Sequence, residues 1–200
     1  MGVTLLLLTQ NLQLLYVGVA GGLLTLLYSF LKYRSLGDVV ILLNYAVLPI
    51  MGTSIVAVGH IDWTAMVLVV PLGLITDSIL HINNARDAVS DREAGIHTFA
   101  MRIGAKASAL LYKLEVLLPY VWVVVAILVG WLPIFSLLVL ATAKTAWGMA
   151  RQSSKLLTEG VAGVATLDQQ SAALQAKFSI MMIVALVVSA LVGWGPVINL

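Results

Sequence analysis

The chain has 200 residues, of which 61% are hydrophobic and 10% are charged, and its mean hydropathy is +1.05. Soluble domains are about 45–50% apolar and about 25% charged. The composition therefore excludes an ordinary soluble domain and predicts an integral membrane protein. The sequence has no cysteine, which excludes disulfides, thiolate metal sites and cysteine nucleophiles.

Apolar stretches of about 20 residues, the length that crosses a bilayer as a helix, predict an all-α, multi-pass transmembrane bundle that forms one domain over residues 1–200. Residues 1–9 are apolar but too short to cross, and residues 150–170 are polar. The sequence predicts about six full spans, with Pro49 expected to kink the second. The expected spans are 12–31, 38–58, 63–86, 106–129, 134–149 and 172–194.

Basic residues are confined to one set of alternate loops, and the opposite loops have none. Under the positive-inside rule this places the basic loops in the cytoplasm and the C-terminus outside, in a plasma or inner membrane. The basic residues are Lys32, Arg34, Arg86, Arg92, Arg102, Lys106, Lys113, Lys144, Arg151, Lys155 and Lys177.

Residues 81–104 concentrate charge in a chain that otherwise avoids it. They hold three of the nine acidic residues and three of the eleven Lys and Arg residues. If residues 77–91 form one helix, the polar side chains from Asp77 to Asp91 fall within a wedge of about 120°. This stripe would run inward from the cytoplasmic end of the third span.

Asp87 and Asp91 are candidate ligands of a divalent cation. At a spacing of four residues their charges repel, and Mg²⁺, which binds carboxylates and bridges to substrate phosphates, would remove that repulsion. Asn84 can add an amide oxygen. The alternative is a solvated helix end at which Arg86 and Arg92 neutralise the two acids.

Other polar residues allow two interpretations each. Asp77 lies inside a span, where ionisable groups are functional candidates, but it can equally be a structural carboxyl. Tyr28 and Lys32 share a helix face and can bind a phosphate, or they can be interfacial anchors. Arg102 and Lys106, with Arg92, can clamp a phosphate, or they can simply supply loop charge. No nucleic-acid-binding motif is present in the sequence.

The run from Asn83 to Gly104 reads N-N-x-R-D-x-x-x-D-R-x-A-G-x-x-T-x-A-x-R-x-G. It resembles the second aspartate-rich motif of the UbiA superfamily of intramembrane prenyltransferases. The opening and the ending of this run are most similar to the 1,4-dihydroxy-2-naphthoate polyprenyltransferases of menaquinone synthesis. Tyr28 and Lys32 resemble the family's Y-x-x-x-K pair.

This resemblance implies Mg²⁺-dependent transfer of a polyprenyl group from a prenyl diphosphate to an aromatic acceptor such as dihydroxynaphthoate. It implies that the metal is held by Asp87 and Asp91 with help from Asn84, and that these acids act in catalysis together with Lys32. It also implies contacts to the diphosphate from a further set of side chains. That set is Tyr28, Lys32, Asn84, Arg92 and Arg102.

The family's first aspartate-rich motif, N-D-x-x-D-x-x-x-D, is not found in these 200 residues. Six spans that end outside resemble helices four to nine of the family's nine-helix fold, so we expect this chain to be the C-terminal two thirds of such an enzyme. Half of the metal site would then be missing, and the chain alone would not catalyse the reaction. Two alternatives are a six-helix carrier that uses the stripe of Asp77, His81 and Asn84, and a non-catalytic membrane protein that binds prenyl diphosphates.

Overall fold

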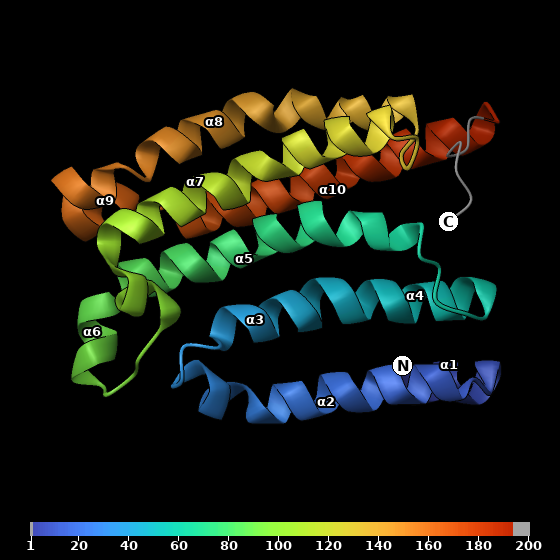
Figure 1. Ribbon diagram of the computed structural model, residues 1–200, viewed down its shortest axis with the longest axis horizontal. Helices are drawn as coiled ribbons and strands as arrows, with labels where there is room; N and C mark the ends of the chain where they lie inside the picture. The colour runs from blue at the N-terminus through green and yellow to red at the C-terminus, as the bar shows by residue number, and fades with distance from the viewer. Residues whose placement is uncertain (1, 194–200) are drawn as a thin grey trace.

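The computed structural model describes residues 2–193, and every regular element in that part of the chain is a helix (Figure 1). The expected all-α, multi-pass fold is confirmed. The elements in chain order are α1 Gly2–Thr9, α2 Leu12–Lys32, α3 Gly37–Leu42, η1 Leu43–Val47, α4 Leu48–Val58, η2 Ala65–Leu68, α5 Val69–Arg86, α6 Ala88–Glu93, α7 Phe99–Leu128, η3 Ile134–Thr142, α8 Ala143–Gln152, α9 Lys155–Thr158, η4 Gly160–Val164 and α10 Leu167–Leu191.

Five helical stretches within residues 2–193 are long and apolar enough to cross a membrane, one fewer than the six predicted. They are Leu12–Lys32, Gly37–Val58, Ala65–Arg86, Phe99–Leu128 and Gly160–Leu191. The expected fifth span at 134–149 is instead divided between the 3₁₀-helix η3 and the short helix α8. Lys144 and Arg151 lower the hydropathy of this stretch. The expected end of the last span, Trp194, lies outside the described residues.

The bundle has two ends that differ in what their connections carry (Figure 1). Connections 33–36, 87–98 and 153–166 gather at one end, which we call the motif end. Connections 10–11, 59–64 and 129–133 gather at the other. Two hydrogen bonds described below hold this end together: Ser35 joins connection 33–36 to connection 87–98, and Arg86, the last residue of α5, joins that helix to connection 153–166.

The core lies among α5, α7, α8 and α10. Its largest fully buried side chains include Tyr112, Phe178 and Leu174. The buried tyrosine hydroxyls are paired: Tyr112 Oη lies 2.8 Å from Ser171 Oγ, and Tyr120 Oη lies 2.7 Å from the hydroxyl of Thr142. Such pairing removes the cost of burying a hydroxyl. By contrast, α2 has no buried residue.

Local chemistry explains two breaks in helical geometry. Pro49 has no N–H, and in a regular α-helix its ring clashes with the carbonyl four residues earlier. That carbonyl belongs to Tyr45, which lies in the π-helix η1, where the helix is wider than an α-helix. In α7, Gly104 has φ 80°, a conformation that glycine adopts without steric cost. Ser108 Oγ donates to the Ala100 carbonyl across this kink at 3.2 Å.

Candidate functional site

The predicted single helix over residues 77–91 is wrong, because the helix changes direction at Asp87. Helix α5 ends at Arg86, Asp87 has φ −88° and ψ 8°, and α6 begins at Ala88. The Asp91 amide still donates to the Asp87 carbonyl at 2.8 Å. The two acids therefore remain one turn apart at the motif end, although the wheel angle predicted for Asp91 no longer applies.

The Arg86 guanidinium joins the motif to the start of α10. Its Nε lies 2.9 Å from Asp87 Oδ1, and its Nη1 lies 2.7 Å from Asp168 Oδ2. It also donates to the Asn83 side-chain oxygen and to the Ala165 carbonyl. The predicted neutralisation of Asp87 by Arg86 is therefore present, and Asp168 shares the same cation.

Asp91 is the less engaged of the two motif acids. Within residues 2–193 its carboxylate forms no ion pair or side-chain hydrogen bond. A groove of about 510 Å³ between α6 and η4 is lined by Arg86, Asp87, Ser90, Glu93 and Ala165. The motif thus faces a hollow that is wide enough for a polar ligand and open at the end of the bundle.

Lys32 and Arg102 approach the motif from neighbouring elements. The connection after Lys32 is held to residues 87–98 because Ser35 Oγ donates to the His97 carbonyl at 3.1 Å. Arg102 lies in the first turn of α7, whose N-cap is Thr98; the Thr98 hydroxyl accepts from the Met101 amide at 3.4 Å. The Arg92 and Arg102 side chains are exposed. Three cations of the predicted site therefore come to one end of the bundle.

Asn84 points toward the interior instead, and Tyr28 is half-buried on α2. Asn84 is 3% exposed, and its Nδ2 donates to Asp38 Oδ1 at 3.5 Å. The structure thus pairs the Asn84 amide with Asp38 rather than with the motif acids.

Sequence analysis missed two acids that lie against the predicted polar stripe. Asp38 on α3 is 9% exposed and its Oδ2 lies 3.9 Å from His81 Nδ1. Glu115 on α7 is 1% exposed, and neither of its carboxylate oxygens has a hydrogen-bond partner within residues 2–193. Both acids lie within apolar spans, and an ionisable residue in such a span is a signal in the sequence that could have identified them. We call Asp38, Asp77, His81, Asn84 and Glu115 the buried polar cluster.

The motif acids supply part of a magnesium site. Mg²⁺ is commonly held by one or two carboxylates, waters and substrate phosphates. Asp87 and Asp91 fit that partial set because they are one turn apart, and Asp87 lines the groove between α6 and η4. In the described part of the chain, no group of three His, Cys, Asp or Glu residues is arranged to hold a metal ion. The remaining ligands would come from the substrate and water.

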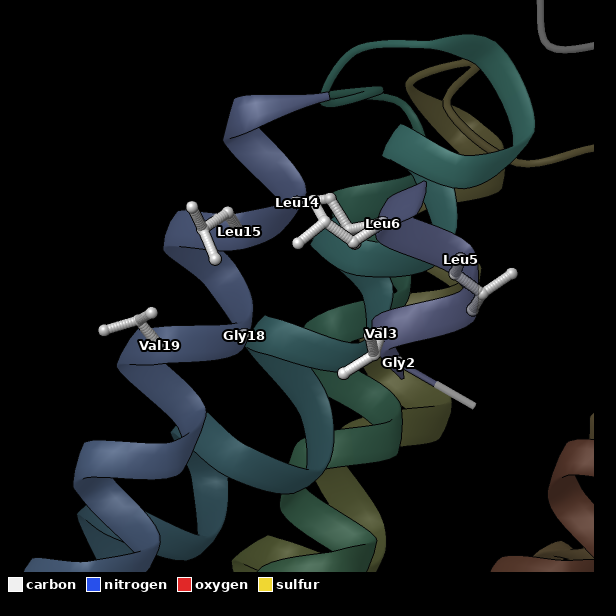
Figure 2. A pocket seen from close by; sticks show the side chains of 8 residues that line it. All are labelled: Gly2, Val3, Leu5, Leu6, Leu14, Leu15, Gly18 and Val19. Carbon is white, nitrogen blue, oxygen red and sulfur yellow. The ribbon is translucent and has the colours of Figure 1, made fainter. Parts of the chain in front are cut away.

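A second groove, of about 340 Å³, is almost wholly apolar and lies between α1 and α2 (Figure 2). Its lining includes Leu5, Leu6, Leu14, Leu15 and Val19. Val19 precedes Lys32 by thirteen residues, which is roughly 20 Å along a helix. This groove therefore lies away from the motif and carries no polar chemistry.

Comparison with known proteins gives one family. A sequence model of the UbiA prenyltransferase family matches residues 1–161. The UbiA prenyltransferase domain-containing protein 1 of Homo sapiens is 39% identical over 146 residues, which are 72% of this chain and 42% of that protein. The Xenopus tropicalis protein of the same name is 40% identical over 146 residues, 72% of this chain and 41% of its own length.

A homolog of that protein in Drosophila melanogaster is 41% identical over 114 residues, which are 56% of this chain and 31% of the homolog. The chain thus spans between about a third and two fifths of the length of these relatives. All three relatives bear the name of the UbiA domain, and none is named as a 1,4-dihydroxy-2-naphthoate polyprenyltransferase.

Proposed function

Because this chain belongs to the UbiA prenyltransferase family, we propose that it takes part in moving a polyprenyl group from a prenyl diphosphate to an aromatic acceptor. The acceptor we propose is of the dihydroxynaphthoate type, as in menaquinone biosynthesis. The observation that carries the proposal is the motif of residues 83–104, in which Asp87 lines a groove at the end of the bundle where Lys32 and Arg102 also lie.

We assign the diphosphate to the motif end. Asp87 and Asp91 would hold Mg²⁺, which would neutralise charge as the diphosphate leaves. Lys32, Arg92 and Arg102 would bind phosphate oxygens through charge-assisted hydrogen bonds, with Tyr28 beside Lys32 on the same helix face. Asn84 would contribute from the interior side of the site, where its amide donates a hydrogen bond to Asp38.

Arg86 sets a condition on metal binding. Its guanidinium now lies against the carboxylates of both Asp87 and Asp168. A divalent cation held by Asp87 would compete with this ion pair, and Asp168 would then retain the guanidinium. Arg86 therefore keeps the motif acid neutralised before the substrate arrives.

The isoprenoid tail would extend from the motif end along apolar helices in the bilayer. Most outward side chains of α2 and α10 are large and apolar, including Leu26 and Ile183. We propose that the motif end faces the cytoplasm, because the basic residues gather there. The prenyl diphosphate would then enter from the aqueous side while its tail stays in lipid.

The test is turnover by the full-length protein in lipid, with Asp87→Asn and Asp91→Asn as variants. Removing either carboxylate should lower prenyl transfer by about 100-fold or more, the scale of losses seen when a group that stabilises transition-state charge is removed. Asp62→Asn, at the opposite end of the bundle, is the matched control. Unchanged turnover in both motif variants, with folding intact, contradicts the assignment.

A membrane carrier is the second candidate, and the buried polar cluster is the observation in its favour. Ionisable groups inside a membrane bundle often mark a substrate or ion path. Flux of a solute into liposomes that is lost in Asp77→Asn and kept in Asp87→Asn would favour the carrier. Prenyl transfer with the reverse dependence favours the enzyme.

A further inference from the structure

A polar groove of about 740 Å³ lies at the motif end, among the last turns of α8, the short helix α9 and the start of α10 (Figure 1). None of its lining residues lines the groove between α6 and η4 that holds Asp87. We call it the basic groove, because two of its six lining residues are cations and none is an acid. The lining residues are Gly148, Arg151, Gln152, Lys155, Thr166 and Gln170.

The cations of the basic groove are available to a ligand. The Arg151 side chain is exposed, and within residues 2–193 it forms no ion pair or hydrogen bond. Lys155 Nζ lies 3.2 Å from Glu159 Oε1, and both of these side chains are about half exposed. An exposed pair of this kind contributes little, so Lys155 can exchange it for another anion. Asp168, the acid nearest to Thr166 in the sequence, is held by Arg86.

Side-chain amides connect the segments that form the basic groove. Gln152 Nε2 donates to the Gly163 carbonyl at 3.2 Å, and Gln152 Oε1 accepts from Gln170 Nε2 at 3.2 Å. Gln170 Nε2 also donates to Thr166 Oγ1 at 2.9 Å, so the Thr166 hydroxyl keeps its own proton to donate. These bonds tie α8, η4 and α10 together and leave one hydroxyl and two cations as donors to an anion.

Close packing fixes the turn that carries the two cations. A Cβ at Gly163 would lie 2.6 Å from Lys155 Cβ and 2.9 Å from the Lys155 carbonyl oxygen, so η4 lies directly against α9. Ser153 is fully buried, and its Oγ donates to the Ala109 carbonyl of α7 at 3.2 Å. At Gly148, by contrast, a Cβ would meet nothing within 4 Å. The groove is therefore held in shape and has open space beside Gly148.

The basic groove lies at the level where the last span enters the membrane. The helical stretch Gly160–Leu191 is long and apolar enough to cross, and Thr166 lies near its start. Trp147, one turn before Arg151, and Leu157 of α9 are both exposed. Tryptophan is enriched at membrane–water interfaces, and basic pockets between membrane helices bind anionic lipid headgroups there. The surroundings of the groove thus favour a lipid phosphate.

We propose that the basic groove binds the phosphate of an anionic membrane lipid. Arg151 and Lys155 bind phosphate oxygens through charge-assisted hydrogen bonds, and the Thr166 hydroxyl donates to the same group. A lipid bound in this way places its acyl chains in the bilayer beside Trp147 and Leu157, where a soluble phosphate has nothing to contact. The inference goes beyond prenyl transfer and does not depend on it, because no residue of this groove has a role at the proposed diphosphate site.

Native mass spectrometry of the purified protein in detergent, titrated with phosphatidylglycerol or phosphatidylcholine, tests the proposal. We expect phosphatidylglycerol to bind about tenfold more tightly, the scale of one charge-assisted hydrogen bond, because choline offsets the phosphate charge of the other lipid. Arg151→Gln should remove most of this preference. Gly148→Leu should weaken binding of phosphatidylglycerol by filling the open space of the groove. Lys177→Gln removes an exposed lysine outside the groove and is the matched control.

Three results would overturn the proposal: equal binding of the two lipids, an unchanged preference in Arg151→Gln, or equal losses in Arg151→Gln and Lys177→Gln. The last result would mean that general surface charge attracts the lipid. Thermal unfolding in detergent shows whether each variant is folded. Arg151 is exposed, so Arg151→Gln alone is decisive if Gly148→Leu does not fold.

Competition identifies the source of the phosphate. We expect inorganic phosphate and a soluble short-chain prenyl diphosphate to leave phosphatidylglycerol bound. Displacement by inorganic phosphate would show a site for a soluble anion, and displacement by the prenyl diphosphate would show that the groove takes the substrate. Either displacement would overturn the assignment to a membrane lipid.

Discussion

Acidic side chains have different surroundings at the exposed end of α5 and in its buried middle. At the motif end, Asp87 and Asp168 share the Arg86 guanidinium, and all three side chains are partly exposed. Six to ten residues before Asp87, in the interior, His81 and Asp77 lie with Glu115 and Asp38 without a Lys or Arg partner in the described chain. An exposed ion pair exchanges readily for a ligand, whereas buried acids can be neutralised only by what reaches them.

The largest expected effect comes from a substitution at Gly73, where α5 packs closely against α3. A Cβ at this position would lie 2.5 Å from Leu42 Cδ1 and 3.2 Å from Ala46 Cβ. Gly73→Ala should therefore lower the free energy of unfolding by about 2 kcal/mol, within the range for overpacked cores. It should also weaken the contact of Asp38 with His81. Gly148→Ala, which meets nothing within 4 Å, is the control.

Chemical unfolding in mixed micelles measures the Gly73→Ala effect. Equal losses of stability in the Gly73→Ala and Gly148→Ala variants would contradict the expected overpacking between Gly73 and its neighbours Leu42 and Ala46.

Lys32→Gln tests the assignment of the diphosphate to the exposed motif end. If Lys32 binds the diphosphate, its removal should lower kcat/KM for the prenyl diphosphate by about tenfold, the equivalent of roughly 1.4 kcal/mol. Steady-state kinetics at fixed ionic strength measures this change. Lys177→Gln, which removes an exposed lysine on α10, is the control, and equal effects of the two changes would point to general surface charge.

Arg86 and Asp168 give the smallest expected effect. A partly exposed ion pair contributes at most about 1 kcal/mol, so Arg86→Gln and Asp168→Asn should each lower stability by no more than that. The double variant should lose less than the sum, because the two side chains contact each other. The loss should shrink at high salt. Strict additivity would mean that the pair is not coupled.

Sequence reasoning identified the features that depend on local composition. Apolar length located the spans from Leu12 through Leu128 to within a few residues, apart from the start of α7, which begins at Phe99. The motif of residues 83–104 indicated the family, which the comparisons confirm. The finer branch assignment stays a proposal, because the relatives found carry only the name of the UbiA domain.

Features that depend on contacts between distant segments were not predicted. The helix break at Asp87 accompanies an ion pair between Arg86 and Asp168, which are 82 residues apart in the sequence. Asp38 sits at the start of an apolar span, and only the packing of α3 on α5 shows that it faces His81. Glu115 needed the same information. Periodicity assigns a face to a residue but does not say which neighbour covers that face.

The π-helix at Leu43–Val47 has a consequence for how this fold tolerates insertions and deletions. A π-turn holds one residue more than an α-turn, so the two halves of the second span keep different angular registers. Deleting a single residue here would restore an unbroken α-helix and rotate Gly37–Leu42 by about 100° relative to Leu48–Val58. Asp38 would then leave the face that meets His81, so the length of this short segment sets the phase of the whole helix.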